Sequence, residues 1–285
     1  MPQDHRLQQQ RFELKYLVEE SATGWMRDLV SSYLELDEFG IGKPGLAYPV
    51  HSVYLDSDEL ETHHAYINAT KNRYKLRLRY YDAAADSPVF VELKARVDNC
   101  ILKRRCGIRR EAVPLVLAGQ LPDMDQLITT EPRHLAALER FIVLMQEINA
   151  RPKLHNCYQR EAWVSPHDNS VRVTFDRQVF AEPYFRSEAT VQMQNPRLIY
   201  SPFTILELKF TNRFPDWFKV LVQRFNLMQG SSAKYSEGVT LVGDEHFSAD
   251  SNWREMSSEH RIAPMPEAGL VSTQQQLNER LVFKR

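Results

Sequence analysis

The chain has 285 residues, which suits one large domain or two small ones with a substantial core. Its 36 Lys and Arg balance 37 Asp and Glu, which argues against a general binder of nucleic acid or membrane surfaces, because such proteins are usually basic overall. The three cysteines lack CxxC spacing and argue against a disulfide framework or a zinc knuckle. A reducing, cytoplasmic compartment is therefore expected.

The N-terminal segment, MPQDHRLQQQ, is polar and lacks the apolar stretch of a secretory signal peptide. No apolar run approaches the roughly 20 residues that span a bilayer. We therefore expect no direct membrane span. Any association with the inner face of a membrane would go through a separate membrane protein.

The coarse pattern of the chain is one of short alternating strands broken by a few helices. Alternation of apolar and polar residues predicts strands at 11–18, 50–56, 73–81, 89–97, 101–111, 153–164, 171–180 and 204–211. Helical spacing of apolar residues predicts helices at 21–36, 57–67, 132–148 and 215–228. Asp56 or Ser57 can cap the start of the second helix.

Hairpin-length links join the middle strands, so we expect a largely antiparallel sheet. Closure into a barrel would also remove exposed sheet edges. The predicted fold class is α+β: an eight-stranded antiparallel β-barrel with helices packed outside. We expect this domain over residues 1–245 and a loosely ordered C-terminal tail over 246–285, where Ser, Glu and Gln are frequent and periodicity is lost.

The most unusual stretch is NRYKLRLRYYD, residues 72–82, in which Arg73, Lys75, Arg77 and Arg79 occupy every second position. Because alternate side chains of a strand point to opposite faces, these four cations share one face. Other predicted strands alternate in the same way. Their charged or polar faces carry Arg11, Glu13, Lys15, Glu92, Lys94, Arg96, Lys103, Arg105, Tyr158, Arg160, Arg172, Thr174, Asp176, Glu207 and Lys209.

Two interpretations of these faces compete. For a single strand, a solvated outer face with cross-strand ion pairs is the simpler one. However, exposed pairs contribute only about 0–1 kcal/mol, so stability does not explain a surplus of guanidinium groups repeated over six strands. If helices cover the apolar faces from outside, the charged faces must line a barrel lumen.

A cationic lumen is expected to hold an anion of high charge density, because buried like charges are costly unless they are paired. The planar fork of Arg suits phosphate oxygens. The carboxylates Glu13, Glu92 and Glu207 would repel phosphate unless a divalent cation lay between them. Mg²⁺ or Mn²⁺, held by carboxylate and phosphate oxygens, is the expected cofactor.

The stretches RFELKY, YKLRLRYY, VELKAR, NCYQREAW, VRVTFDR, ILELKF and SSAKYSEG, in this order, carry a family resemblance. Together they resemble the catalytic domain of vacuolar transporter chaperone (VTC) polyphosphate polymerases. These belong to the triphosphate tunnel metalloenzyme, or CYTH-like, superfamily, whose eight-stranded antiparallel tunnel binds nucleotide or inorganic polyphosphate. The resemblance runs from about residue 11 to residue 238, and each motif is weak on its own.

The resemblance implies roles for individual residues, in agreement with the phase of the strands. The residues expected to act on the transferred phosphoryl group are Arg77, Arg79, Arg160, Arg172 and Lys234. Those expected to bind substrate are Lys15, Lys94, Lys103, Tyr158, Lys209 and Arg11, and those expected to hold the metal are Glu207, Glu13 and Glu92. Ala233 stands where the family commonly has a serine, which puts one hydroxyl contact to phosphate in doubt.

The resemblance implies a polyphosphate polymerase that transfers the γ-phosphate of ATP to a growing inorganic polyphosphate chain and releases ADP. A phosphate nucleophile is already ionised near neutral pH, so no general base is required. One alternative is a tripolyphosphatase or nucleoside triphosphatase with water as acceptor, for which Glu13 or Glu92 would be the base. A non-catalytic polyphosphate-binding module is another. ATP and inorganic polyphosphate are the expected partners, and nucleic acid is not.

Other candidate motifs are weaker. The adjacent His63 and His64 do not share a helical face, so we interpret them as structural rather than as metal ligands. GKPG at 42–45 lacks the full phosphate-loop pattern and predicts a turn. Asp176 could pair with a lumen arginine or assist the metal, and both roles stay open. Arg73 and Lys75 lie near the start of their strand, and their roles are also open.

Overall fold

The computed structural model describes residues 11–247, apart from residues 99, 167 and 169. Nearly all of the predicted C-terminal tail lies outside the described residues, so the boundary at 245 stays a prediction. The tail's first two residues, 246 and 247, end a short 3-10 turn at Asp244–Phe247.

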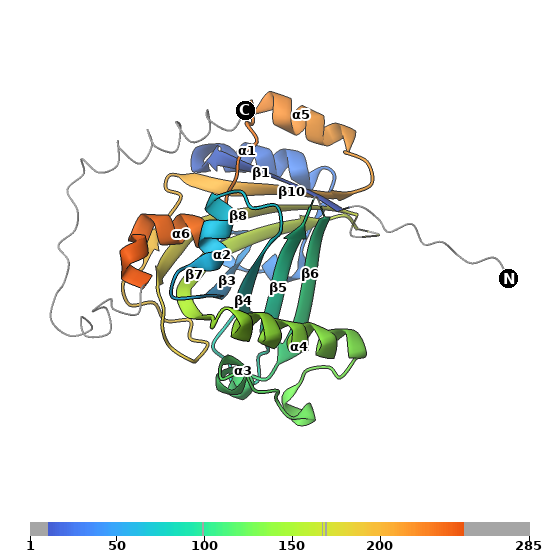
Figure 1. The fold of residues 1–285 in the computed structure, drawn as a ribbon. Helices are drawn as coiled ribbons and strands as arrows, with labels where there is room; N and C mark the ends of the chain where they lie inside the picture. Colours follow the sequence, from blue (N-terminus) through green and yellow to red (C-terminus); the bar gives the residue numbers. More distant parts are fainter. Residues whose placement is uncertain (1–10, 99, 167, 169, 248–285) are drawn as a thin grey trace. The chain divides into compact units, whose positions relative to one another are not determined.

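Eight long antiparallel strands form one sheet, in the order β1-β10-β8-β7-β3-β4-β5-β6 (Figure 1). They are β1 (Arg11–Glu19), β3 (Ala47–Asp56), β4 (Arg73–Tyr80), β5 (Val89–Val97), β6 (Cys100–Ile108), β7 (Arg151–Val164), β8 (Val171–Pro183) and β10 (Phe203–Thr211). Two short strands, β2 (Glu35–Leu36) and β9 (Arg197–Leu198), pair with β7 and β8. This confirms the predicted α+β class and the eight antiparallel strands.

The sheet curves as a half-barrel whose edge strands are β1 and β6. In the described residues, backbone pairing runs from β1 to β6 and does not join these two strands to each other. A side-chain contact crosses the gap instead, because Lys94 Nζ of β5 lies 3.5 Å from Glu13 Oε2 of β1. The charged faces of the two ends of the sheet therefore look toward each other.

Helices cover the apolar faces of the strands. Figure 1 shows α1 (Thr23–Ser31) and α5 (Asp216–Arg224) beside β1 and β10, and α4 (Pro132–Glu147) across β5 and β6. Leu206 and Leu208 of β10 share a buried cluster with Phe218 of α5. Leu76 and Leu78 of β4 share another with residues of α4. Because the apolar residues of these strands face helices, their charged residues face the lumen, as the sequence predicts.

Helix α6 (Lys234–Val242) is different, since it lies on the charged side of the sheet at one end. Its Tyr235 stacks on Tyr54 of β3 at 5.0 Å between ring centroids, and its Ser236 Oγ accepts a hydrogen bond from Lys75 of β4. It also packs on β7, β8 and the helix α2 (Glu61–Ile67). The sequence does not predict this helix, because Gly, Val and Thr within it are poor helix formers.

Other boundaries differ from the predicted ones for local reasons. The helix predicted at 57–67 begins only at Glu61, because Leu60 adopts a left-handed conformation with φ of 56°. Asp56 still caps it, accepting hydrogen bonds from the backbone N–H of Thr62 and His63. The strand predicted at 101–111 ends at Ile108, where a 3-10 turn and the short α3 (Val113–Leu117) follow. The helix predicted at 21–36 is limited to Thr23–Ser31.

A close approach at Gly238 fixes the position of α6. A Cβ at this position would lie 2.7 Å from Leu154 Cδ2 and 3.1 Å from Ala181 Cβ, whereas a Cβ at Gly24 of α1 would meet nothing within 4 Å. We therefore expect Gly238→Ala to be about 1–3 kcal/mol less stable than Gly24→Ala, because overpacking outweighs the gain in helix propensity. Urea denaturation measures both variants, and equal free energies of unfolding would contradict this packing argument.

Candidate functional site: a charged lumen

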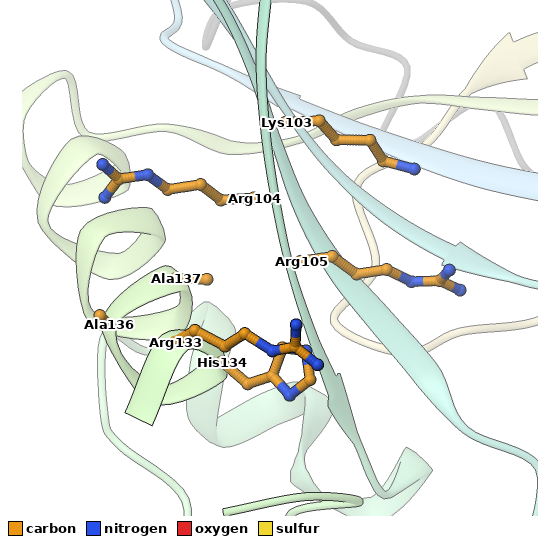
Figure 2. A pocket seen from close by; sticks show the side chains of 7 residues that line it. All are labelled: Lys103, Arg104, Arg105, Arg133, His134, Ala136 and Ala137. Carbon is orange, nitrogen blue, oxygen red and sulfur yellow. The ribbon is translucent and has the colours of Figure 1, made fainter. Parts of the chain in front are cut away.

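The register of the sheet brings lumen residues of opposite charge together. Lys15 of β1 lies opposite Glu207 of β10, and Arg77 of β4 lies opposite Glu92 of β5. Arg160 of β7 lies opposite Asp176 of β8. Figure 2 shows the alternation on β6, where Lys103 and Arg105 project to one side and Arg104 to the other, toward α4. The strand period thus separates lumen cations from outer ones.

Glu207 is the centre of the first cluster of charges and is only 4% exposed. Its oxygens lie 2.6 Å from Lys209 Nζ and 3.4 Å from Lys15 Nζ, with Arg160 and Lys234 slightly further away. Burial alone would raise the pKa of this carboxyl, but the surrounding charges, led by Lys209 and Lys15, hold it well below its usual range. Glu207 is therefore ionised at neutral pH.

Asp176 anchors the second cluster and is fully buried. Arg160 donates two hydrogen bonds to its carboxylate, at 2.7 and 2.8 Å, and Lys234 donates a third at 2.7 Å. Burial acts to raise the pKa of Asp176, and the charges of Arg160 and Lys234 lower it below its usual value. Of the two roles left open for Asp176, pairing with a lumen arginine is the one its contacts support.

Glu92 of β5 anchors the third cluster, where it is shared by cations of the two neighbouring strands, β4 and β6. Arg77 Nε donates to it at 2.7 Å and Lys103 Nζ lies 3.1 Å away. Arg105 and Arg79 lie at 3.6 and 3.9 Å. Burial acts to raise the pKa of Glu92, yet the charges of Arg77, Arg79 and Lys103 hold it far below its usual range.

Glu13 joins both ends of the sheet. It lies 3.1 Å from Lys15 of its own strand and 3.5 Å from Lys94 of β5. Burial acts to raise the pKa of Glu13, but the Lys15 charge leads a net lowering to about 2. Four lumen carboxylates, Glu13, Glu92, Asp176 and Glu207, are thus each shared by two or more cations, and the lumen keeps an excess of positive charge.

Comparison with known proteins shows the family of this chain. Residues 10–242 match the family model described as the VTC domain. The chain belongs to the VTC domain family. Vacuolar transporter chaperone complex subunit 4 of Schizosaccharomyces pombe is 21% identical over 235 residues, which cover 68% of this chain and 33% of that protein. The matched part of this chain thus corresponds to about a third of the length of that curated relative.

A solved structure, a protein of Pyrococcus horikoshii OT3, is also similar to the VTC domain. It is 12% identical, with a TM-score of 0.42, and the match covers 82% of this chain and 100% of that one. In the described part of the VTC domain, no helix has both the length and the apolar character needed to cross a membrane.

Two predicted site residues of the VTC domain, on β8 and β1, stand outside the three clusters of contacts above. Arg172 of β8 lies opposite Lys209 in the register, and its Nη2 lies 2.9 Å from Asp37 and 3.4 Å from Tyr48 Oη. Arg11 begins β1 opposite Thr211, and its predicted role stays a prediction. Tyr158 lies among the central cations, with Lys234 Nζ 4.6 Å from its ring centroid and Arg79 donating to its hydroxyl at 3.4 Å.

Lys75 differs from the other lumen cations in its surroundings. Its Nζ donates to Ser236 Oγ at 3.0 Å and lies 4.2 Å from the centre of the Tyr66 ring. Across the described ranges, no carboxylate oxygen lies within 4.0 Å of it. Burial, followed by the charges of Lys15 and Lys94, lowers the pKa of Lys75 to about 7.

Sequence reasoning missed some residues that contact the site. Tyr54 accepts a hydrogen bond from Arg77 at 3.2 Å, but β3 carries no alternating charge that would point to it. The spacing of Arg105 places it on the charged face, but the sequence does not single it out as a site residue. It lies 3.6 Å from Glu92. The helix α6, which supplies Lys234 and Ser236 together, gave no helical signal.

The predicted metal ligands divide into two groups. Glu13 and Glu207 both contact Lys15, both are ionised, and hard carboxylate oxygens suit Mg²⁺ or Mn²⁺, so this pair fits such an ion. Glu92 is enclosed by two guanidinium groups and an ammonium group within 3.6 Å. These contacts give Glu92 a counter-ion role, and since Glu207 also has four cations within 3.9 Å, the role of Glu92 as a metal ligand stays a prediction.

Glu92→Gln should therefore destabilise the VTC domain by about 3–5 kcal/mol, because it leaves the largely buried Arg77 and Arg79 without their counter-ion. Asp98→Asn is the matched control. It removes an exposed carboxylate 2.9 Å from Lys71 and should cost at most about 1 kcal/mol. Chemical denaturation at neutral pH compares the two, and similar losses would show that Glu92 does not hold the cluster together.

Proposed function

We propose that this VTC domain is a polyphosphate polymerase, which transfers the γ-phosphoryl group of ATP to a growing inorganic polyphosphate chain. The observation that carries the proposal is the lumen in which cations from six strands and α6, some of them buried and others partly exposed, converge on only four carboxylates. Such an excess of partly desolvated positive charge is costly when empty and is offset by a polyanion. Because neighbouring cations lower the pKa values of these carboxylates, they are ionised at neutral pH and remain paired with the cations.

The positions of the cations suggest how they act. Arg77 and Arg79 lie side by side on β4, and Arg160 and Lys234 meet at Asp176 across the lumen. We infer that they bind the triphosphate and neutralise charge that develops on the transferred phosphoryl group. The terminal phosphate of the chain attacks the γ-phosphorus in line, the bond to the bridging β–γ oxygen breaks, and ADP leaves. Positioning and electrostatics supply most of the catalysis.

Glu13 and Glu207 are the residues that would hold Mg²⁺ or Mn²⁺. Such an ion supplies charge neutralisation between the carboxylates and the phosphate oxygens. Lys15, which contacts both carboxylates, orients them toward each other and keeps them ionised.

The low basicity of the available carboxylates favours a polymerase over a hydrolase. Activation of water needs a base whose pKa is near the working pH. Burial and charge together place the pKa of Glu13 at about 2, and the pKa of Glu92 lies lower than its usual range. Both groups are weak bases, whereas a phosphate nucleophile needs none.

We also propose a cytoplasmic location with a separate membrane protein as partner. The curated relative is named as a subunit of a vacuolar transporter chaperone complex. A similar partner would receive the product of this domain and place it at the inner face of a membrane.

Incubation with ATP and Mn²⁺ or Mg²⁺, followed by separation on a urea gel, tests the proposal. A ladder of long chains is the expected result. Orthophosphate alone would instead identify a hydrolase, and unchanged ATP with retained binding of inorganic tripolyphosphate would identify a binding module. Omission of the divalent ion should abolish the ladder.

Arg77→Ala combined with Arg79→Ala should lower polymer formation by at least about 100-fold, because two phosphate-binding guanidinium groups are lost. The fold should persist, since Lys103 and Arg105 still neutralise Glu92. Arg104→Ala is the control: it lies on β6 but points away from the lumen (Figure 2), and its activity should equal that of the wild type. Wild-type activity in the double variant would disprove the lumen as the active site.

Binding of inorganic tripolyphosphate should take up a proton at Lys75. Burial first and nearby lysine charges next lower its pKa to about 7 in the free protein, and a bound anion raises the pKa. Affinity should therefore weaken as the pH rises above 7, by up to about tenfold per pH unit. In Lys75→Met this dependence should be smaller than in the exposed control Lys71→Met, as measured by calorimetry at several pH values. Identical pH profiles would contradict the role of Lys75.

A further inference from the structure

A second group of possible metal ligands lies outside the lumen, where α2 meets the end of α6. His63 and His64 belong to α2, and Asp244 follows α6 directly. One ligand atom from each of these residues lies within 4.8 Å of the other two. His63 is buried, whereas His64 and Asp244 are exposed, so the group is open to solvent on one side.

The backbone around this group is held in place by a single buried carboxylate. Asp56 accepts hydrogen bonds from the N–H of His63 at 3.0 Å and from the hydroxyl of Tyr235 in α6 at 2.7 Å. It therefore fixes α2 and α6 relative to each other. Gly243, with φ of 103°, turns the chain after α6 and directs Asp244 back toward α2. This framework thus helps to bring the three side chains together.

The distances suit an ion between the side chains better than a direct contact. His63 Nε2 and Asp244 Oδ1 are 3.7 Å apart, which is too long for a hydrogen bond. Two ligands about 2.0–2.1 Å from one tetrahedral ion are separated by roughly 3.4 Å. The rings of His63 and His64 have centroids 5.1 Å apart at 67°, so they are not stacked face to face. Burial lowers the pKa of His63 and favours the neutral imidazole that binds metals.

We propose that His63, His64 and Asp244 form a binding site for a divalent transition-metal ion such as Zn²⁺, with water completing the coordination. Two imidazoles and a carboxylate select such ions over Mg²⁺, which prefers oxygen ligands. This proposal departs from the interpretation of His63 and His64 as structural residues. Although adjacent residues do not share a helical face, ligand atoms of His63 and His64 lie within 4.8 Å of each other.

The bound ion would tie the end of α6 to α2. Lys234, at the other end of α6, contacts Asp176 in the lumen. The metal would thus stabilise the helix that presents this lysine, without contacting substrate. The site stands whether the lumen polymerises, hydrolyses or only binds polyphosphate.

Titration of metal-free protein with Co²⁺, monitored by visible absorption in the presence of excess Mg²⁺, tests the site. The Mg²⁺ fills oxygen-ligated sites such as that of Glu13 and Glu207, so the cobalt bands report imidazole ligation. We expect one equivalent of Co²⁺ to bind, Zn²⁺ to displace it, and Zn²⁺ to raise the melting temperature of the protein. His64→Ala and Asp244→Ala should each weaken Co²⁺ binding by more than about tenfold.

His246→Ala, which removes a nearby histidine outside the group, is the matched control and should bind Co²⁺ like the wild type. Both test residues are exposed, so their variants should fold, and circular dichroism verifies this. Absence of cobalt bands in the wild type would overturn the proposal. So would wild-type affinity in either His64→Ala or Asp244→Ala, or an equal loss of affinity in His246→Ala. None of these readouts depends on catalysis, so failure here leaves the proposed polymerase activity untouched.

Discussion

Partial neutralisation of buried charge is the constraint on which this lumen depends. Without carboxylates, the guanidinium and ammonium groups of neighbouring strands would repel one another at separations of one strand spacing. With as many carboxylates as cations, the lumen would not attract a polyanion. The structure meets both demands by sharing each carboxylate, as Glu92 is shared by Arg77, Lys103 and Arg105. The sheet thereby remains stable while keeping positive charge for a ligand.

Much of this arrangement could be predicted because a strand has a period of two. Once Arg77 and Lys94 are placed on one face of their strands, helices must cover the other face, and the eight strands were located within a few residues of their true ends. The same alternation placed Glu207 and Arg160 in the lumen. What alternation could not give is the pairing between strands, because the register depends on loops and on packing.

The remaining features depend on contacts between residues far apart in the chain. Helix α6 has weak helical propensity and is held by its packing on β7 and β8, where Gly238 permits the close approach. The proximity of Asp244 to His63 likewise follows from this packing and from no local pattern. Lys75 could be placed in the lumen by its spacing, but its lack of a nearby carboxylate became visible only in three dimensions.

At the gap between the two edge strands, the wall of the lumen is not joined by backbone hydrogen bonds between those strands in the part of the chain that the structure describes. Elsewhere the wall is closed by backbone hydrogen bonds, which respond little to ionic strength. Across the gap, Lys94 of β5, the strand next to the edge strand β6, pairs with Glu13 of β1, and both partners are partly exposed. Dissolved salt screens such a pair over distances of about 10 Å at 0.1 M. Separation of the two ends of the sheet is therefore expected to become easier as the salt concentration rises, whereas the backbone pairing of the other strands should change little.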